Sequence, residues 1–147
     1  MAAKALSFDV GDYVVYPKHG VGRVIELQKQ GKVRSIGVSN FQAEHLRTII
    51  EATGVTPAVN QIELHPYLCQ EQLRALHDSL GIVTESWSPL GRGRLLEEPV
   101  VRDVAATLGV TPAQVVIRWH VQHGLVVIPK TTHCERMRVN ADVFSFG

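Results

Sequence analysis

Two patterns of hydrophobic and polar positions follow each other along the chain, and the change lies near Gly31. From Phe8 to Leu27, apolar and polar residues alternate around a Gly-rich turn, which is typical of an antiparallel β-hairpin with one solvated face. From Gly31 onward, short apolar runs alternate with amphipathic segments, which predicts repeated βα units around a parallel sheet. The pattern therefore divides the chain into residues 1–30 and residues 31–147.

Start and stop signals place the elements of the second part. Ser39 followed by Gln42 has the spacing of a capping box, so we expect a helix to open at Ser39 and to stop at Gly54. Thr111, Pro112 and Gln114 form a stronger start signal of the same kind. The predicted strands are residues 33–38, 58–62, 82–87 and 125–128, and the further predicted helices are residues 70–80, 98–108, 112–123 and 134–140.

Polar residues follow each predicted strand, at the end where parallel βα arrays bind ligands. They are Ser39 and Asn40, residues 61–65, Trp87 and Ser88, and finally Lys130, Thr131 and Thr132. The last group suits a phosphate, because a lysine, two hydroxyls and the first amides of a helix supply a charge and several donors. Trp87 offers a flat apolar face, and the guanidinium of Arg136 can stack on an aromatic base.

These residues predict a nucleotide site, but each also has a structural interpretation. Ser39 can be a helix cap, Lys130 and Arg136 can belong to a solvated face, and Trp87 can be a core residue. Seven histidines show no metal-binding spacing, which favours surface or packing roles and no metal.

Composition narrows the class of protein. The chain has 147 residues, of which 45% are hydrophobic and 20% charged, and its net charge is +1. These values are typical of a globular protein and give no global signal for nucleic-acid binding. No apolar run reaches membrane-spanning length and no signal peptide is evident, so we expect a cytoplasmic protein without a membrane partner. Cys69 and Cys134 lie in no paired motif and are expected to be reduced.

Four ordered motifs resemble the C-terminal half of an aldo-keto reductase. They are GKVRSIGVSNF at residues 31–41, VNQIELHP at 59–66, SWSPLGRG at 86–93 and VVIPKTTHCERMRVNADVF at 126–144. The resemblance implies an α/β fold with about four parallel βα units, half of a (βα)8 barrel. We expect this half-barrel either to flatten into an open sheet with helices on both faces or to be closed by self-association.

The resemblance also implies NADP(H) as cofactor and aldehyde or ketone reduction as the parent activity. Ser39, Asn40 and Gln61 match residues that hold the nicotinamide carboxamide, and Trp87 matches the aromatic residue that stacks on the ring. Residues 88–94 match a loop over the pyrophosphate, where Ser88 and Leu90 make contact and the following arginines form a mobile cover. Lys130 and Thr131 match the 2'-phosphate site, Arg136 flanks that phosphate and the adenine, and Asn140 contacts the adenine.

The catalytic Asp, Tyr, Lys and His of the family lie in the other half of the barrel. We therefore expect no catalytic residue here and little or no reductase activity, because carbonyl reduction needs a proton donor beside the substrate oxygen. Tyr67, near His65, is the alternative donor. The chain also stops before the last barrel helix and the tail that shapes the substrate pocket.

The first part, FDVGDYVVYPKHGVGRVIEL, resembles the opening hairpin of a CarD-like RNA-polymerase-interacting domain. An isolated hairpin is marginally stable, so we expect it to patch the half-barrel and to form one folded unit with it. The join, between Val24 and Gln30, predicts a chimera, engineered or natural.

Three hypotheses of function remain. They are a half-barrel that binds NADP(H) with little turnover, a stable fold without biochemical function, and a transcription-associated module. Open sheet edges and an uncovered apolar face predict self-association, whereas binding to RNA polymerase or nucleic acid is not expected.

Overall fold

Four short parallel strands run side by side in chain order. They are β1 (Gly37–Ser39), β2 (Val59–Glu63), β3 (Val83–Trp87) and β4 (Val126–Val127), and they form one sheet in the order β1-β2-β3-β4. The computed structural model describes residues 28–146. The parallel sheet confirms the predicted α/β class, while the hairpin expected at residues 8–27 lies outside the described residues.

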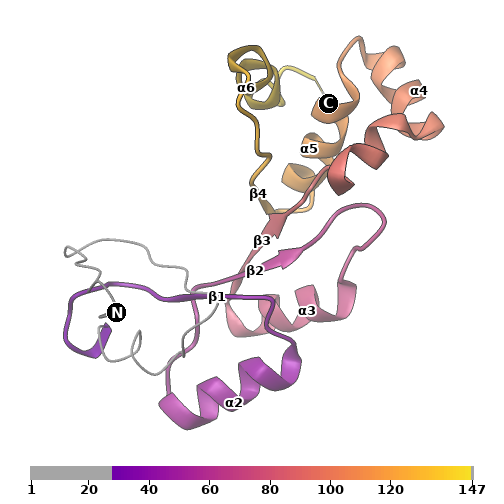
Figure 1. Cartoon of the computed structure of the whole chain (residues 1–147). Coiled ribbons are helices and arrows are strands. Elements are labelled where there is room, and N and C mark those ends of the chain that lie inside the picture. The colour runs from indigo at the N-terminus through magenta and orange to yellow at the C-terminus, as the bar shows by residue number, and fades with distance from the viewer. Residues whose placement is uncertain (1–27, 147) are drawn as a thin grey trace, which may run out of the picture.

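Helices connect the strands (Figure 1). α2 and α3 lie at one end of the molecule, and the remaining helices lie at the other end. They are α2 (Ala43–Thr53), α3 (Glu71–Leu80), the 3-10 helix η1 (Gly91–Glu97), α4 (Pro99–Leu108), α5 (Pro112–Gln122) and α6 (Cys134–Ala141). Each crossover between adjacent parallel strands contains at least one helix, as a βα array requires.

The helix start expected at Ser39 is wrong. Ser39 is the last residue of β1 and pairs with Gln61 of β2, and the N-cap of α2 is Gln42. Three residues of strand and turn thus precede the helix, and the capping box is made instead by Gln42 and His45, whose Nδ1 accepts from the Gln42 amide at 3.1 Å. Ser39 is in a strand rather than at a helix N-cap, because pairing with β2 satisfies backbone groups that a cap at Ser39 would leave unpaired.

The strand predicted at residues 33–38 is also misplaced, since β1 covers only Gly37–Ser39. The helix stops after α2 and α3 and the start of α5 are confirmed. Gly54 and Gly81 end α2 and α3 in left-handed conformations, with φ of 70° and 69°. The amide of Gln114 donates to Thr111 Oγ1 at 3.3 Å, and the amide of Thr111 donates to Gln114 Oε1 at 3.0 Å, which completes the predicted capping box of α5.

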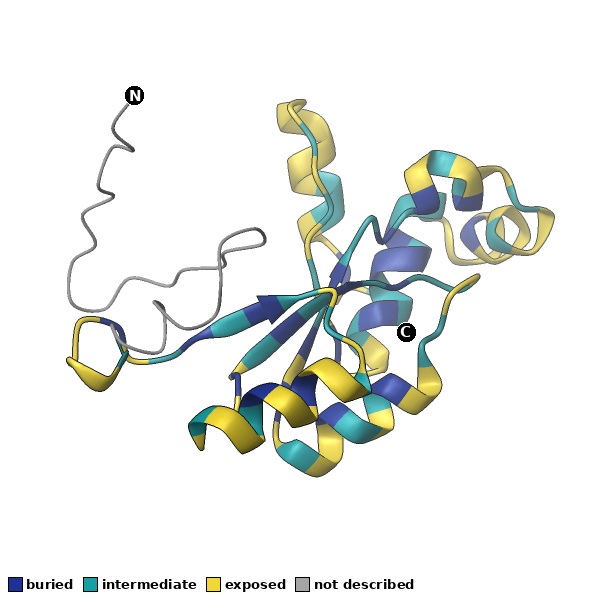
Figure 2. Cartoon of the chain, turned by 60° about the horizontal axis from the view of Figure 1, so that its bottom comes forward, coloured by how far each residue is buried: buried dark blue, intermediate teal, exposed yellow. Residues whose placement is uncertain are grey.

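The two faces of the sheet have different environments, as the alternation of buried and half-buried residues along the strands shows (Figure 2). Val38 and Ile62 point toward the helices and are buried with Leu46, Ile49 and Leu73 in one core cluster. Their strand neighbours point the other way and are half-buried or exposed, with Val83 and Val126 exposed by 47% and 43%. Within residues 28–146 the core cluster thus lies on one face of the sheet, and the choice between a flattened open sheet and closure by self-association stays a prediction.

Gly37 marks a close approach between β1 and β2. A Cβ at this position would lie 2.5 Å from Val59 Cγ1. A side chain at position 37 would force Val59 or the strand to shift, because Gly37 pairs with Val59 in the ladder. The glycine thus allows β1 to approach β2 closely and to present Ser39 beside Gln61.

Candidate functional site

A chain of hydrogen bonds joins the ends of β1 and β3. The indole Nε1 of Trp87 donates to Asn40 Oδ1 at 2.9 Å, and Asn40 Nδ2 donates to Ser39 Oγ at 3.2 Å. Ser39 Oγ in turn donates to the Gln61 carbonyl at 3.1 Å. The structure therefore brings together four of the residues that the sequence assigned to one group, Ser39, Asn40, Gln61 and Trp87.

The register of the sheet explains this grouping. Ser39 pairs with Gln61, and Gln61 pairs with Glu85, so the three side chains form one row across the less covered face. Gln61 Nε2 donates to Glu85 Oε1, which fixes the orientation of the Gln61 amide and leaves its oxygen free to accept. Glu85 is a member of this row that sequence reasoning missed, because its place opposite Gln61 depends on the register of β2 and β3.

Two residues of this site have unusual backbone conformations. Asn40 has φ of 59° and Ser88 has φ of 53°, and each directly follows a strand. Left-handed backbone is tolerated by asparagine but is uncommon for serine. Such conformations are concentrated at binding sites, where the surrounding structure holds them.

The segment after Ser88 forms a tight turn and then η1. The amide of Gly91 donates to the Ser88 carbonyl and the amide of Gly93 donates to that of Leu90, both at 2.9 Å. Arg92 and Gly93 depart from helical geometry, with φ of 56° and 88°, and the side chains of Arg92 and Arg94 are exposed. These arginines belong to an ordered turn, and their motion as a cover stays a prediction.

A second group of predicted residues lines a depression between the end of β4 and α6. Its volume is about 410 Å³, and its lining consists of Pro129, Lys130, Thr131, Met137, Asn140 and Ala141. Thr131 Oγ1 accepts from the His133 amide at 3.2 Å, so its hydroxyl hydrogen remains free to donate. Lys130 is exposed and makes no ion pair with the described carboxylates.

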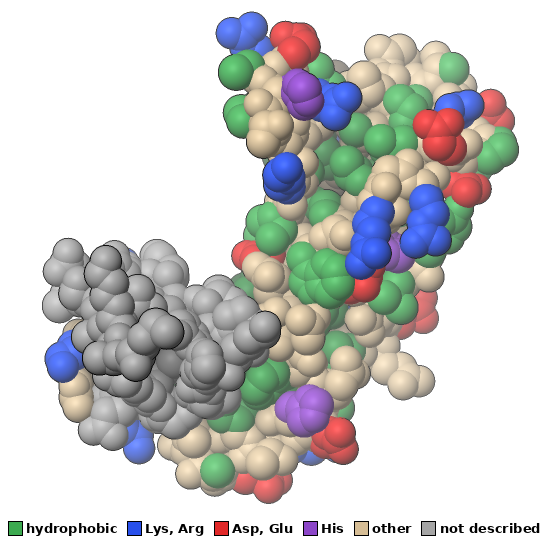
Figure 3. All heavy atoms as spheres, viewed as in Figure 1, with side chains coloured by type: hydrophobic (Ala, Val, Ile, Leu, Met, Phe, Trp, Pro, Cys, Tyr) green, Lys and Arg blue, Asp and Glu red, His purple; other side chains and the backbone are tan. Residues whose placement is uncertain are grey.

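Arg136 does not line this depression. Met137, Asn140 and Ala141 share one face of α6, and Arg136 lies at the edge of that face, four residues before Asn140 and about 40° from it around the helix. Its side chain is exposed and makes no ion pair within the described residues, in contrast to Arg138, which lies 3.9 Å from Glu135. Figure 3 shows Lys and Arg side chains along α6 and the segment that leads into it.

The segment after α6 holds this helix in place, since α6 itself has no buried residue. Gln114 Nε2 donates to the Asp142 carbonyl at 2.6 Å, and Arg118 Nη1 donates to the Val143 carbonyl at 3.0 Å. Val143 is buried beside them. The position of the depression therefore depends on the contacts between α5 and residues 142–143.

Comparisons with known proteins show the family of this chain. Residues 4–147 match the aldo/keto reductase family. The chain belongs to this family. It is 61% identical over 120 residues to an aldo-keto reductase of Mycolicibacterium smegmatis, covering 82% of this chain and 44% of the relative. It is 53% identical over 152 residues to 2,5-diketo-D-gluconic acid reductase B of Corynebacterium sp., covering 97% of this chain and 55% of the relative.

Solved structures of aldo-keto reductases have the same fold over this region. The protein Gox0644 superposes with a TM-score of 0.82 at 54% identity, covering 85% of this chain and 46% of that protein, and a mutant of it was solved in complex with NADPH. An aldo/keto reductase from Brucella melitensis superposes with a TM-score of 0.81 at 41% identity, covering 91% and 54%. The chain thus spans about half the length of the relatives it matches.

The family match begins at residue 4 and so includes the segment that resembles a CarD-like hairpin. None of the comparisons described above supports a CarD-like domain or a chimera. The transcription-associated interpretation has no support among the described residues.

The alternative proton donor, Tyr67, faces another partner in this aldo-keto reductase chain. A hydrogen bond to Glu98 raises the pKa of the exposed Tyr67 hydroxyl, with burial and the Glu98 charge acting in the same direction. His65 lies 3.6 Å from Glu63 Oε1 through its Nε2. Tyr67 and His65 thus each have a carboxylate neighbour, and the role of Tyr67 as an alternative proton donor stays a prediction.

A buried polar network lies directly beneath the first group and was missed by sequence reasoning. It consists of Asn60 on β2, His77 on α3 and Thr84 on β3, all buried. Burial lowers the pKa of His77, an effect that Asp78 partly opposes. The available signal was a histidine four residues after Leu73, on the apolar face of its helix.

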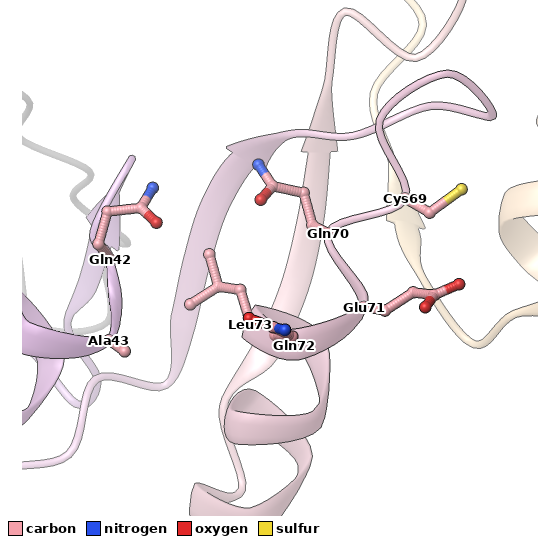
Figure 4. A pocket seen from close by; sticks show the side chains of 7 residues that line it. All are labelled: Gln42, Ala43, Cys69, Gln70, Glu71, Gln72 and Leu73. Atoms are coloured by element: carbon pink, nitrogen blue, oxygen red, sulfur yellow. The ribbon is translucent and has the colours of Figure 1, made fainter.

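A further depression, of about 470 Å³, lies between the first turns of α2 and α3. The side chains of Gln42 and Gln70 point toward each other across it, whereas the Glu71 carboxylate points away (Figure 4). None of the predicted cofactor residues lines it. Its polar groups are largely engaged locally, since Gln70 Nε2 donates to the Glu63 carbonyl and Cys69 Sγ lies 3.4 Å from that of Pro66.

Residues 28–146 show neither a metal-binding cluster nor a single membrane-spanning helix. These residues contain no group of three His, Cys, Asp or Glu side chains that can hold a metal ion. No single helix among them is long and apolar enough to cross a membrane, although α4 and α5, bent by 92°, meet the same criteria when combined.

Proposed function

We propose that this chain binds NADP(H) along the carboxyl ends of its strands. The observation that carries the proposal is the hydrogen-bonded row from Ser39 to Trp87, together with a lysine-lined depression at the end of the neighbouring strand. Ligands of parallel α/β proteins bind at this edge. A solved relative that binds NADPH supports the choice of cofactor.

The donor set fits the nicotinamide end of the cofactor. A carboxamide needs one donor and one acceptor, and the Asn40 amide and the free oxygen of Gln61 supply both. The half-buried indole of Trp87, held by its bond to Asn40, offers a flat face to the ring. Ser39 holds the row together through its bond to the Gln61 carbonyl.

The depression beside α6 fits the other end of the cofactor. Lys130 and the free hydroxyl hydrogen of Thr131 supply a charge and a donor for the 2'-phosphate, and Asn140 lies in the same lining for the adenine. Arg136, exposed on α6, is placed to flank the base from outside the lining. Ser88 and Leu90 carry the turn between the two ends, where the pyrophosphate is expected.

NADPH supplies a hydride when it is bound, and the protein must supply the proton. Among residues 28–146, Tyr67 and His65 are paired with Glu98 and Glu63. We therefore propose binding with little or no turnover by this chain alone. The parent activity, reduction of aldehydes or ketones, is suggested by relatives such as the methylglyoxal reductase DkgA of Escherichia coli, which is 54% identical over 125 residues.

A titration of the purified chain with NADPH tests the proposal. We expect a saturable change in cofactor and tryptophan fluorescence, because Trp87 lies in the site. The absence of a saturable signal at millimolar NADPH would contradict it and would favour the alternative of a stable fold without biochemical function. Binding that is unchanged in both Lys130→Ala and Arg136→Ala would contradict the assignment of the phosphate end.

Self-association is the second part of the proposal, and apolar exposure supports it. Val83, Val126 and Ile128 are exposed on or beside the less covered face of the sheet, where Figure 3 shows hydrophobic side chains gathered. Parallel sheets normally have both faces covered, so two half-barrels that face each other would bury these residues. Light scattering on purified protein tests this: a dimer mass or higher is expected, and a monomer at high concentration would contradict it.

A further inference from the structure

The Asn60 side chain binds the backbone of the segment that carries Ser39 and Asn40. The amide of Phe41 donates to Asn60 Oδ1 at 3.3 Å, and Asn60 Nδ2 donates to the Phe41 carbonyl at 2.9 Å. Asn60 is completely buried, and it clamps the point where the chain leaves the site and enters α2. The clamp acts from the helix-covered face, so it cannot itself touch a ligand on the opposite face.

The orientation of Asn60 depends on His77. Asn60 Nδ2 lies 3.0 Å from His77 Nε2, and His77 Nδ1 lies 2.8 Å from Thr84 Oγ1. Because Nδ2 can only donate, His77 Nε2 must accept and Nδ1 carries the proton, which it donates to Thr84. A reversed Asn60 amide would place its oxygen against this acceptor and would lose both bonds to Phe41 at the same time.

We propose that His77 is a positioning residue that, through Asn60, fixes the Ser39–Phe41 segment in its site geometry. The inference rests on the proposed function for its effect on cofactor binding, while its effect on the segment can be measured without cofactor. Asn40, which holds a left-handed conformation with φ of 59°, is anchored on one side by the β1–β2 ladder and on the other by the clamp at Phe41. Loss of the clamp would release the second anchor.

The neutral state of His77 is part of this device. Protonation would turn Nε2 into a donor that faces the donor Nδ2 of Asn60. The groups that face His77 are Asn60 from β2 and Thr84 from β3, and Asp78 on its own helix acts on its charge. His45 Nδ1, at the start of α2, accepts from the Gln42 amide beside the segment, so the pH series is recorded in a His45→Gln background.

His120 on α5 is a matched control. It is also completely buried, and its ring nitrogens bind the carbonyls of Val116 and Leu64 rather than the clamp. A different tryptophan reports on the surroundings of each of the two histidines. His77 is linked to Trp87 through Asn60, Phe41 and Asn40, whereas the His120 ring contacts the Trp119 ring at 4.9 Å.

The experiment compares the substitutions His77→Leu, His77→Gln, His120→Leu and His120→Gln. The indole N–H signals of Trp87 and Trp119, the chain's two tryptophans, are recorded by NMR and assigned with Trp119→Phe. Amide exchange of Phe41 and the Kd for NADPH are measured on the same variants. Gln at position 77 can offer an amide oxygen in place of Nε2, so it restores the acceptor, whereas Leu cannot.

We expect His77→Leu to shift the Trp87 indole signal and to speed Phe41 exchange about tenfold, as the loss of one buried hydrogen bond implies. His77→Gln should restore most of both signals. His120→Leu should shift Trp119 and leave Trp87 and Phe41 unchanged. In the His45→Gln background, the Trp87 signal should also change as the pH falls through the pKa of His77, and not in His77→Gln.

Unchanged Trp87 and Phe41 signals in folded His77→Leu would overturn the proposal, and so would equal effects of His120→Leu. If His77→Leu does not fold, Thr84→Val serves instead, because it removes the acceptor that orients His77 while conserving volume; unchanged signals in that variant would likewise overturn the proposal. Failure of the wild-type chain to bind NADPH would refute the proposed function alone, since both signals are read without cofactor.

Discussion

Removal of the Lys130 side chain should affect the binding of NADP(H) but not the binding of NAD(H). Lys130 lies in the depression beside α6, where the proposed 2'-phosphate of NADP(H) would bind, and NAD(H) has no phosphate there. We therefore expect Lys130→Ala to weaken NADPH binding and to leave NADH binding unchanged within about twofold.

The magnitude follows from the exposure of the site. Two unit charges 4 Å apart interact by about 1 kcal/mol in water and about 4 kcal/mol near a protein surface. Lys130 is exposed, so the lower part of this range applies, about 1–2 kcal/mol. This corresponds to a Kd for NADPH that is about 5 to 30 times higher, and the difference should shrink in about 1 M salt, where the screening length falls to about 3 Å.

Fluorescence titrations with both cofactors, at low and high salt, provide the measurement. Lys32→Ala is the control, because Lys32 is also an exposed lysine but precedes β1 and lines neither depression. An equal loss for NADPH and NADH would mean that the substitution disturbs the fold rather than a phosphate contact. Unchanged affinity for both cofactors would contradict the assignment of Lys130 to the 2'-phosphate.

Other substitutions test the fold that presents the site. Gly37→Ala should lower the free energy of unfolding by about 1–3 kcal/mol in urea titrations, because the new methyl group meets Val59; an unchanged midpoint would show that the strands separate freely. Thr111→Ala should lower the free energy of unfolding by about 1 kcal/mol through loss of the α5 cap, which is measured as a lower urea midpoint. Thr111→Ser should keep most of the stability of the wild-type chain, because its hydroxyl can also cap the helix. Burial lowers the folded-state pKa of His77 and His120 below the ordinary value of about 6.5, so their contribution to the free energy of unfolding is complete above that pH and is lost as the pH falls below it. The urea midpoint should therefore be lower at pH 5.5 than at pH 7.5, and this difference should be smaller in the His77→Gln variant. An equal difference in the wild-type chain and the variant would assign the effect to other groups.

The elements that sequence predicted correctly are those decided by neighbours in the chain. Gly54 and Gly81 end helices because a left-handed residue is needed there, and Thr111 with Gln114 caps α5 through bonds within one turn. The helix start predicted at Ser39 was wrong because the partner of Ser39, Gln61, lies 22 residues away in the chain. A cap signal and a strand end look alike until the pairing of the strands is known.

The candidate site shows the same division. Lys130, Thr131 and Asn140 meet because a short turn joins β4 to α6, and that proximity follows from the sequence. The position of Arg136 outside the lining depends on the rotation of α6, which is set by contacts of residues 142–143 with α5. No local pattern contains that information.

The Asn60–His77 network was beyond local pattern reading for a physical reason. Its members are 17 residues apart and meet because α3 packs on β2 with His77 turned inward. A histidine on a helix is more often a surface residue, and only its spacing from Leu73 indicates the core face. Polar groups that are satisfied inside a core become evident only when both partners are placed.

The most direct test of the account is an amide NMR map of the wild-type chain with NADPH and with adenosine 2',5'-bisphosphate, which lacks the nicotinamide half. We expect NADPH to shift the signals of Asn40, the Trp87 indole, Thr131 and Asn140, and the bisphosphate to shift only those of Thr131 and Asn140. Shifts by NADPH that leave either group of residues unchanged, or no saturable shift at all, would contradict the claim that one cofactor spans both ends of the site.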